Sequence, residues 1–195
     1  MEAQVLTLPD SKPLTVRTAT AENAPATLAL SLALFRSVVD EGLYTVREPS
    51  EFDVTEAEER GYIEEDRVAS GNLRLVATEG DDAVVGMVRA STGTHRRTGH
   101  FADIDSLWVN ASWRRLGMDG GLLSALVSWA RDHAEIERLG LSAFSTNEAA
   151  IRLYRRHGFA VEGRYSRDIK FADGTYADTV ARGLMVKERS AAPRA

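Results

Sequence analysis

The order of apolar and polar positions predicts one strand and two helices in the first third of the chain. Residues 14–18 predict a short strand, and a helix can begin after it at residue 20 or 21. Apolar side chains recur on that helix at the i, i+4, i+7 spacing of a single face: Leu28, Leu32 and Phe35. Thr55 with Glu58 three residues later is the signature of a capping box, so we expect a second, charged helix that ends near Ser70.

An antiparallel meander follows these helices. Two apolar segments, residues 73–80 and 83–91, flank a turn at residues 80–82 and predict a hairpin. A third strand covers residues 100–109, after a basic loop that contains glycine. Consecutive strands joined by tight turns are antiparallel, so this part of the chain predicts half of an antiparallel sheet.

The second half of the chain alternates helix and strand. Apolar residues recur at helical spacing over residues 120–133, and a mostly apolar strand covers residues 138–146. Asn147 is a suitable N-cap for a helix that ends at Gly158. The last two strands lie within residues 159–186 and form a hairpin around a turn that contains glycine.

Two of these strands should be parallel. The strand that ends at Val109 and the strand over residues 138–146 are joined through a helix, which requires a right-handed crossover. We therefore predict an α+β fold with a mixed, mostly antiparallel sheet, a central parallel strand pair and flanking helices. The carboxyl ends of parallel strands leave a crevice, and we expect a ligand site there.

Composition bounds the fold and excludes several kinds of chemistry. The chain has 195 residues, and we assign residues 1–12 to an N-terminal extension, 13–187 to one domain and 188–195 to a tail. The absence of cysteine excludes disulfides, thiolate metal sites and a cysteine nucleophile. No group of His and carboxylate residues has metal-ligand spacing, so we expect no metal.

Charge and apolar content also limit the expected partners. The formal charge of −5 disfavours general nucleic-acid binding. No signal-peptide pattern and no apolar stretch of about 20 residues is present, so we expect a cytoplasmic protein without membrane contact. The glutamates of the helix over residues 55–70 predict a solvated face without chemistry: Glu56, Glu58, Glu59, Glu64 and Glu65.

Arginine and glycine gather where the strand that ends at Val109 enters the next helix. The segment WRRLGMDGG has Arg114, Gly117 and the pair Gly120 and Gly121 at the start of the amphipathic helix. Helix N-termini bind phosphate groups because unpaired N–H groups point at the anion, and glycine lets the backbone approach closely. An ordinary loop with surface arginines has the same composition, so on these residues alone both interpretations stand.

The chain resembles the GNAT superfamily of acyl-CoA-dependent N-acyltransferases. The family signature, Gln/Arg-x-x-Gly-x-Gly/Ala, is matched at Arg114 and Gly117, and the segment STNEAAIRLYRRHGFAVEG, residues 145–163, resembles the second conserved block of the family. The closing segment, residues 165–186, is similar to a bacterial branch that acetylates free amino acids and similar small amines. The resemblance implies acetyl-CoA as co-substrate and direct transfer of its acetyl group to a primary amine.

The resemblance also implies which residues hold acetyl-CoA. In the family, backbone N–H groups at a bulged strand end hold the acetyl carbonyl, and the signature segment holds the pyrophosphate. The residues implied here are Leu107, Trp108, Val109, Arg114, Arg115, Leu116, Gly117, Met118, Asp119, Gly120, Asn147, Ala150 and Tyr154. Asp119 departs from the signature, which has glycine or alanine there. Its carboxylate either faces the phosphates and repels them or points away.

Two residues are candidates for proton transfer. By resemblance, Tyr154 protonates the departing sulfur, although a core tyrosine with a satisfied hydroxyl is the alternative. Asp103 and Asp105 lie at i and i+2 on one strand face, where each carboxylate raises the pKa of the other. The resemblance gives Asp103 the role of taking the amine's proton through water. Aspartates that only bind the ammonium are the alternative, and His100 is a second candidate base.

These observations together predict an acetyl-CoA-dependent N-acetyltransferase that acts on a free amino acid or another small amine. Two alternatives remain: a non-catalytic or degenerate acyl-CoA-binding GNAT module, which Asp119 supports, and an acetyltransferase of protein N-termini or lysines. We expect a small-molecule amine as partner and neither nucleic acid nor membrane. A homodimer stays open.

Overall fold

The computed structural model describes residues 4–6, 13–41, 45–80 and 83–187, and these contain one mixed sheet in the order β1-β2-β3-β4-β5-β6-β8-β7. The strands are β1 (Gln4–Leu6), β2 (Leu14–Thr18), β3 (Leu73–Glu79), β4 (Ala83–Thr92), β5 (Phe101–Val109), β6 (Arg138–Phe144), β7 (Ala160–Lys170) and β8 (Tyr176–Met185). The pair β5 and β6 is parallel, and the other neighbouring strands are antiparallel. The predicted α+β fold with a central parallel pair is confirmed.

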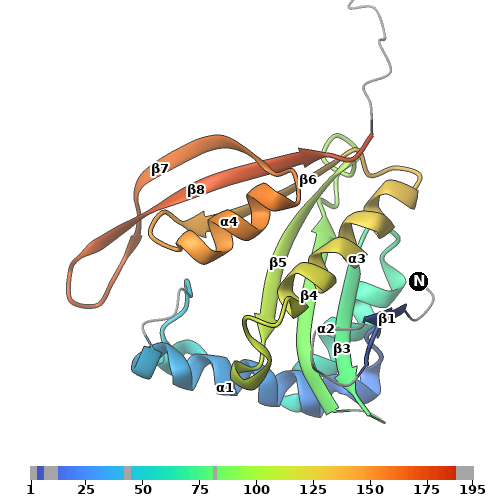
Figure 1. The fold of residues 1–195 in the computed structure, drawn as a ribbon, viewed down its shortest axis with the longest axis horizontal. Helices are drawn as coiled ribbons and strands as arrows, with labels where there is room; N and C mark the ends of the chain where they lie inside the picture. The colour runs from blue at the N-terminus through green and yellow to red at the C-terminus, as the bar shows by residue number, and fades with distance from the viewer. Residues whose placement is uncertain (1–3, 7–12, 42–44, 81–82, 188–195) are drawn as a thin grey trace, which may run out of the picture.

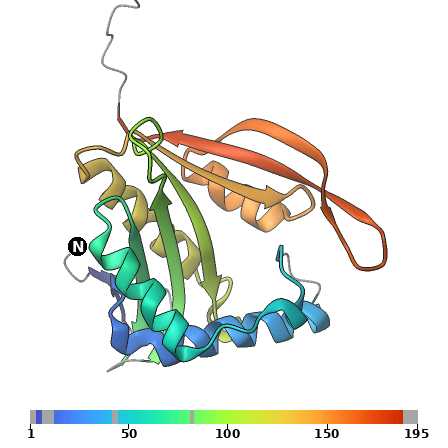
Figure 2. The ribbon, with the colours of Figure 1, turned by 180° about the vertical axis from the view of Figure 1, so that it is seen from behind.

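Helices cover both faces of this sheet (Figures 1 and 2). They are α1 (Ala24–Glu41), α2 (Glu56–Val68), α3 (Met118–Asp132) and α4 (Glu148–Arg156), with short 3₁₀ turns at Ala21–Asn23, Pro49–Glu51 and Ala111–Trp113. The larger hydrophobic core lies under α3 and α4 and includes Leu122 and Leu153. The smaller core lies under α1 and α2 and includes Leu30 and Ile63. Within the described residues, no helix combines the length and the apolar character needed to cross a membrane.

Local capping signals place two of the helices as predicted. At the start of α2, Glu58 N–H donates to the Thr55 hydroxyl, and Thr55 N–H donates to the Glu58 carboxylate at 2.8 Å. At the start of α4, Ala150 N–H donates to the Asn147 side chain at 3.1 Å. Helix α3 begins earlier than predicted, because Gly117 is its N-cap with a left-handed φ of 89°.

The buried face of α1 differs from the predicted stripe. Over residues 24–37, where burial is described, the buried residues of this helix are Ala24, Thr27, Leu30, Ser31 and Phe35. Leu28 and Leu32 are only half-buried. Thr27 and Ser31 can lie inside because each hydroxyl donates to the carbonyl four residues earlier, at 3.1 and 2.9 Å. Apolar spacing alone could not reveal a buried face that contains satisfied hydroxyl groups.

Residues 4–6 belong to the sheet, although we placed them in an N-terminal extension. They form β1 and pair antiparallel with β2. Leu6 packs against the larger core and lies over Gly121, where a Cβ atom would come within 2.4 Å of the Leu6 side chain. This apolar contact explains why so short a strand is part of the fold. Residues 7–12 and 188–195 lie outside the described residues.

Strands β5 and β6 separate after a short common stretch, as Figure 1 shows. Residues 101–103 lie opposite residues 138–140, and the parallel pairing ends there. On the other side of β5, its pairing with β4 shifts by one residue between Asp105 and Trp108. Ser106 lies in this bulge with a left-handed φ of 52°. The divergence and the bulge together open the sheet at its centre.

Candidate active site

A cavity of about 1200 Å³ lies in the opening between β5 and β6. One wall is the carboxyl half of β5, and the opposite wall is formed by residues 142–144 of β6 together with α4. The cavity extends to α1, to the segment before α2 and to the first turn of α3. Segments far apart in the sequence therefore meet at the place where we expected a crevice.

Most of the predicted cofactor-binding residues line this cavity. They are Leu107, Trp108, Val109, Arg114, Arg115, Asp119, Asn147, Ala150 and Tyr154. The remaining ones, Leu116, Gly117, Met118 and Gly120, are not part of its lining. Met118 is fully buried in the larger core, so its side chain serves packing. Gly120 faces Leu153 of α4 and His157, which follows that helix.

The carboxyl half of β5 presents an open backbone edge to the cavity. Within the described residues, no strand pairs with residues 104–109 on the side that faces β6. Backbone N–H groups on such an edge can donate to a ligand oxygen. Arg114 closes this end of the strand, because its Nε donates to the Val109 carbonyl at 3.2 Å.

The bulge at Ser106 changes which side chains share a face of β5. In a regular strand, Asp105 and Trp108 would point to opposite faces, because they are three positions apart. Here Asp105 pairs with Arg89 of β4, and Trp108 packs on the core that contains Met87 of the same strand. The extra residue thus brings a carboxylate and an aromatic ring to one side of the sheet, beside the open edge.

The carboxylate of Asp119 lies on the cavity side of α3. It accepts a hydrogen bond from Gly120 N–H at 2.9 Å, so it occupies one donor of the first helical turn. Asp119 also lines the cavity, and its charge acts on Tyr154. The effect of this charge on a bound pyrophosphate stays a prediction.

Tyr154 projects from α4 into the cavity. Asn147, Ala150 and Tyr154 follow one another at helical spacing and line the same wall. The ring also contacts the larger core, with its centroid 6.1 Å from that of Phe159. Burial, helped by the negative charge of Asp119, raises the pKa of the Tyr154 hydroxyl. The hydroxyl therefore keeps its proton at neutral pH.

Asp103 lies outside the cavity lining. It is in the short parallel stretch, where a Cβ atom on Gly140 would lie 3.3 Å from an Asp103 carboxylate oxygen. Burial raises the pKa of this carboxyl group, Arg138 opposes the rise, and Asp105 adds to it. Asp105 does line the cavity. The structure thus separates the two aspartates by position, although they share a strand face.

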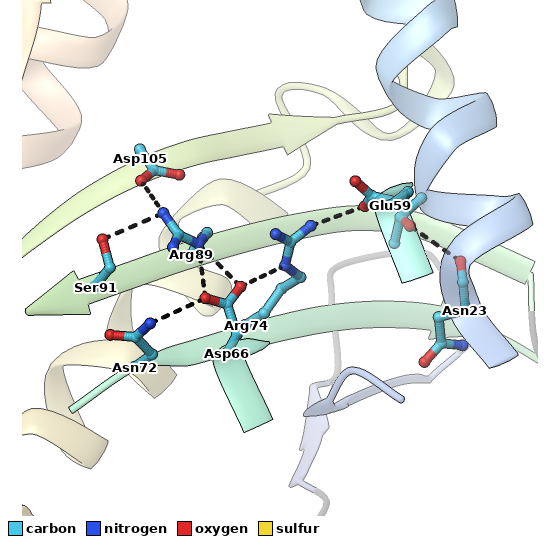
Figure 3. A network of polar contacts seen from close by, with 9 residues as sticks. Asn23, Glu59, Asp66, Asn72, Arg74, Arg89, Ser91 and Asp105 are labelled. Carbon is cyan, nitrogen blue, oxygen red and sulfur yellow. Dashed lines mark hydrogen bonds and ion pairs between the residues drawn. The ribbon is translucent and has the colours of Figure 1, made fainter. Parts of the chain in front are cut away.

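The sequence did not predict a network of largely buried arginine and carboxylate side chains (Figure 3). Arg74 donates to Glu59 at 2.8 Å and to Asp66 at 2.9 Å. Arg89 donates to the same Asp66 and to Asp105, both at 2.9 Å. The network runs from α2 across β3 and β4 to β5, and it ends at the cavity. We call these five residues the charge network.

The expectation that Glu59 belongs to a solvated face is wrong. Glu59, Ile63 and Asp66 form the buried stripe of α2, and two of these three residues are charged. Apolar periodicity cannot detect such a stripe. A signal was present in the strands, because Arg74 and Arg89 interrupt apolar segments and buried guanidinium groups require carboxylate partners.

Comparison with known proteins identifies relatives of this chain. Residues 41–159 match the acetyltransferase (GNAT) family. L-amino acid N-acetyltransferase AaaT of Escherichia coli (strain K12) is 28% identical over 108 residues, which are 55% of this chain and 65% of that enzyme. The chain thus matches just under two thirds of the length of this relative.

Solved structures share the fold over nearly the whole described chain. A GNAT-family acetyltransferase from Streptococcus pneumoniae has a TM-score of 0.78 at 23% identity, covering 88% of this chain and 99% of that one. The structure of yncA from Salmonella typhimurium, which holds its cofactor acetyl-CoA, has a TM-score of 0.78 at 21% identity, covering 95% and 99%. At these identities the likeness establishes the fold.

Proposed function

Since this chain belongs to the acetyltransferase (GNAT) family, we propose that it transfers the acetyl group of acetyl-CoA to the amino group of a free amino acid or another small amine. The observation that carries the proposal is the cavity between the diverging strands β5 and β6. Its lining unites three residues of the signature segment, Arg114, Arg115 and Asp119, with the open edge of β5 and Tyr154. These are the parts that acyl transfer requires: an anion site, carbonyl-polarising donors and an acid.

The residues of the cavity fit the parts of acetyl-CoA. Arg114 and Arg115 bring positive charge to the first turn of α3, whose N–H groups suit a pyrophosphate. The open edge at Leu107, Trp108 and Val109 offers N–H donors to the thioester carbonyl. Acetyl-CoA supplies the activated acetyl group, and these residues of the chain bind and orient it.

Transfer by this arrangement proceeds in one ternary complex. The neutral amine attacks the thioester carbon, while N–H groups of the β5 edge stabilise the negative charge that develops on the oxygen. The C–N bond forms and the C–S bond breaks. The Tyr154 hydroxyl donates its proton to the departing sulfur, and its raised pKa means that this proton is present at neutral pH.

The proton released by the amine needs an acceptor. We assign this role to Asp103 through water, because burial raises the pKa of its carboxyl group toward a range useful for a base. Asp105, on the same strand face and in the cavity lining, lies between Asp103 and Leu107 along the strand. Its position suits binding of the incoming ammonium.

A small amine is favoured as the acceptor over a protein. The relative from Escherichia coli carries the name L-amino acid N-acetyltransferase, and this chain shares 28% identity with it.

The test of the acceptor class is release of free thiol from acetyl-CoA with a panel of amino acids, amines and peptides. A peptide N-terminus that reacts faster than every small amine would overturn this assignment. Binding of acetyl-CoA without thiol release from any amine would favour a non-catalytic module, for which Asp119 remains the supporting residue.

Replacement of Tyr154 by phenylalanine tests catalysis directly. Tyr154→Phe should lower kcat by roughly 10²-fold, as expected for loss of a general acid, with little change in acetyl-CoA affinity. The matched control is Tyr165→Phe on β7, whose side chain is 55% exposed and outside the cavity lining. Unchanged turnover in Tyr154→Phe, with the chemical step rate-limiting, would remove Tyr154 from the mechanism.

A further inference from the structure

The half of the cavity that lies toward α1 and α2 has an aromatic wall. Phe35 of α1 stacks on Phe52 with ring centroids 4.4 Å apart, and it meets Trp108 of β5 edge-on at 5.9 Å. All three rings line the cavity. Phe35 is buried, whereas Phe52 and Trp108 are half-buried and present ring surface to the cavity. We call these three residues the aromatic wall.

Apolar side chains continue the surface of this wall. Leu34, Val54 and Met87 line the same half of the cavity. Helix α1, the segment before α2 and strands β4 and β5 each contribute, so the surface is built by the tertiary fold. A flat apolar group placed here gains stacking and burial, and a short or hydrophilic one does not.

The charge network gives this half of the cavity one polar end. Its members are three carboxylates and two guanidinium groups, so one negative charge remains after pairing. Arg47 and Glu65, which have opposite signs, also line the cavity. Asp66 is buried, with 2% of its side chain exposed, whereas Asp105 at the end of the network is 44% exposed. Asp105 is therefore the carboxylate of the charge network that a ligand in the cavity can reach.

Asp105 and the aromatic wall lie on the same side of β5 because of the bulge at Ser106. Trp108 is both part of the wall and part of the open edge assigned to the thioester. An ammonium group at Asp105 is thus placed beside the reacting carbonyl, with the body of the molecule over Phe52 and Trp108. Resting on the proposed function, we propose that the acceptor is a primary amine attached to an aromatic body, such as an aromatic amino acid or an arylalkylamine.

Two pairs of acceptors that differ in the aromatic ring test this proposal. They are L-phenylalanine against L-alanine and 2-phenylethylamine against ethylamine, with thiol release from acetyl-CoA as the readout. In each pair, kcat/KM for the aromatic member should be roughly 10- to 100-fold higher, the ratio that burial of one such side chain provides. Equal values within both pairs would overturn the proposal.

Substitutions separate the contribution of the aromatic wall from that of Asp105. Phe52→Ala should reduce the aromatic-to-small ratio of kcat/KM about tenfold, and Phe52→Leu, which keeps apolar volume, should reduce it less. Asp105→Asn should raise KM for both members of a pair by similar factors, about tenfold, and leave their ratio unchanged. The control is Val68→Ala on α2, an apolar truncation at a residue that is 82% exposed.

Each variant is checked for folding by its thermal transition and by its stabilisation with acetyl-CoA. A Phe52→Ala protein that folds and keeps the wild-type ratio would overturn the proposal. The failure of the proposed function has a different signature. Thiol release with non-aromatic amines alone would overturn the aromatic preference and leave the acetyltransferase in place, whereas no release with any amine would overturn both.

Discussion

Asp119 places a negatively charged carboxylate where we expect the pyrophosphate of acetyl-CoA to bind. Its carboxylate accepts the Gly120 N–H at 2.9 Å and faces the cavity, so it competes for a donor of the first turn of α3. Two like charges about 4 Å apart repel by about 4 kcal/mol at an effective dielectric of ~20, and solvent reduces this value at an open site. We therefore expect this single side chain to lower the affinity of the chain for acetyl-CoA.

Removal of this carboxylate should strengthen binding. Asp119→Gly, which restores the family signature, should lower the dissociation constant of acetyl-CoA about tenfold, corresponding to ~1.4 kcal/mol. Isothermal titration calorimetry measures the difference. The control is Asp132→Asn, which removes a charge from the other end of the same helix. Equal or weaker binding by Asp119→Gly would show that the carboxylate does not oppose acetyl-CoA.

Asp103 should make the folded protein less stable at neutral pH. Its pKa is raised in the folded state, mainly by burial, so the folded protein holds this proton more tightly than the unfolded chain does. The ionised group therefore costs stability above the folded pKa, and the cost disappears as pH falls below the unfolded pKa. Asp103→Asn should be more stable than the wild type at pH 7, and the two should converge in acid. Urea unfolding at both pH values measures this, and a less stable variant at pH 7 would show that the attraction to Arg138 outweighs burial.

At the scale of elements, the charge network attaches α2 to the sheet. Asp66 is the central member, because both Arg74 and Arg89 donate to it, and Asn72 donates to it at 3.2 Å. The three donors come from β3, β4 and the turn that precedes β3. Loss of the Asp66 charge leaves guanidinium groups in a largely buried place without their carboxylate, which is costly.

Asp66→Asn should therefore lower the free energy of unfolding by about 3–5 kcal/mol. The matched control is Glu64→Gln on the same helix, whose pair with Arg67 is exposed and whose loss should cost less than about 1 kcal/mol. Denaturant unfolding of both variants measures the contrast. Similar small losses in both proteins would mean that the introduced amide replaces the hydrogen bonds of the carboxylate and that charge contributes little to the attachment of α2.

Sequence patterns located the elements with local signals and missed those that depend on distant partners. Thr55 and Asn147 mark helix starts because a cap is formed by neighbouring residues. Asp66 has its partners on two strands, so no local pattern predicts its burial. The cavity was predicted only as a crevice at the parallel pair. Its extent depends on where β5 and β6 stop pairing and on the bulge at Ser106, and alternation of apolar residues does not determine either feature.

For the whole molecule, the cavity lies between two parts of one sheet. Strands β1 to β5 form one part and β6, β8 and β7 form the other, and their direct pairing is limited to residues 101–103 and 138–140. A ligand in the opening contacts both parts. Acetyl-CoA at about 100 times its dissociation constant should stabilise the fold by about 2.7 kcal/mol, and a thermal shift measures this.

The location of that stabilisation distinguishes binding in the opening from binding elsewhere. In the free protein, the edge of β5 over residues 104–109 has no strand partner on the side of β6 within the described chain, so its outward amides should exchange rapidly with solvent. Acetyl-CoA should slow hydrogen exchange most in peptides that cover residues 104–110 and 141–145. Peptides from β3 provide the reference, because this strand is paired on both sides and its amides are protected without ligand. Protection confined to the β7 and β8 hairpin, with no change in residues 104–110, would place the cofactor outside the opening and would contradict the assignment of the β5 edge to the thioester.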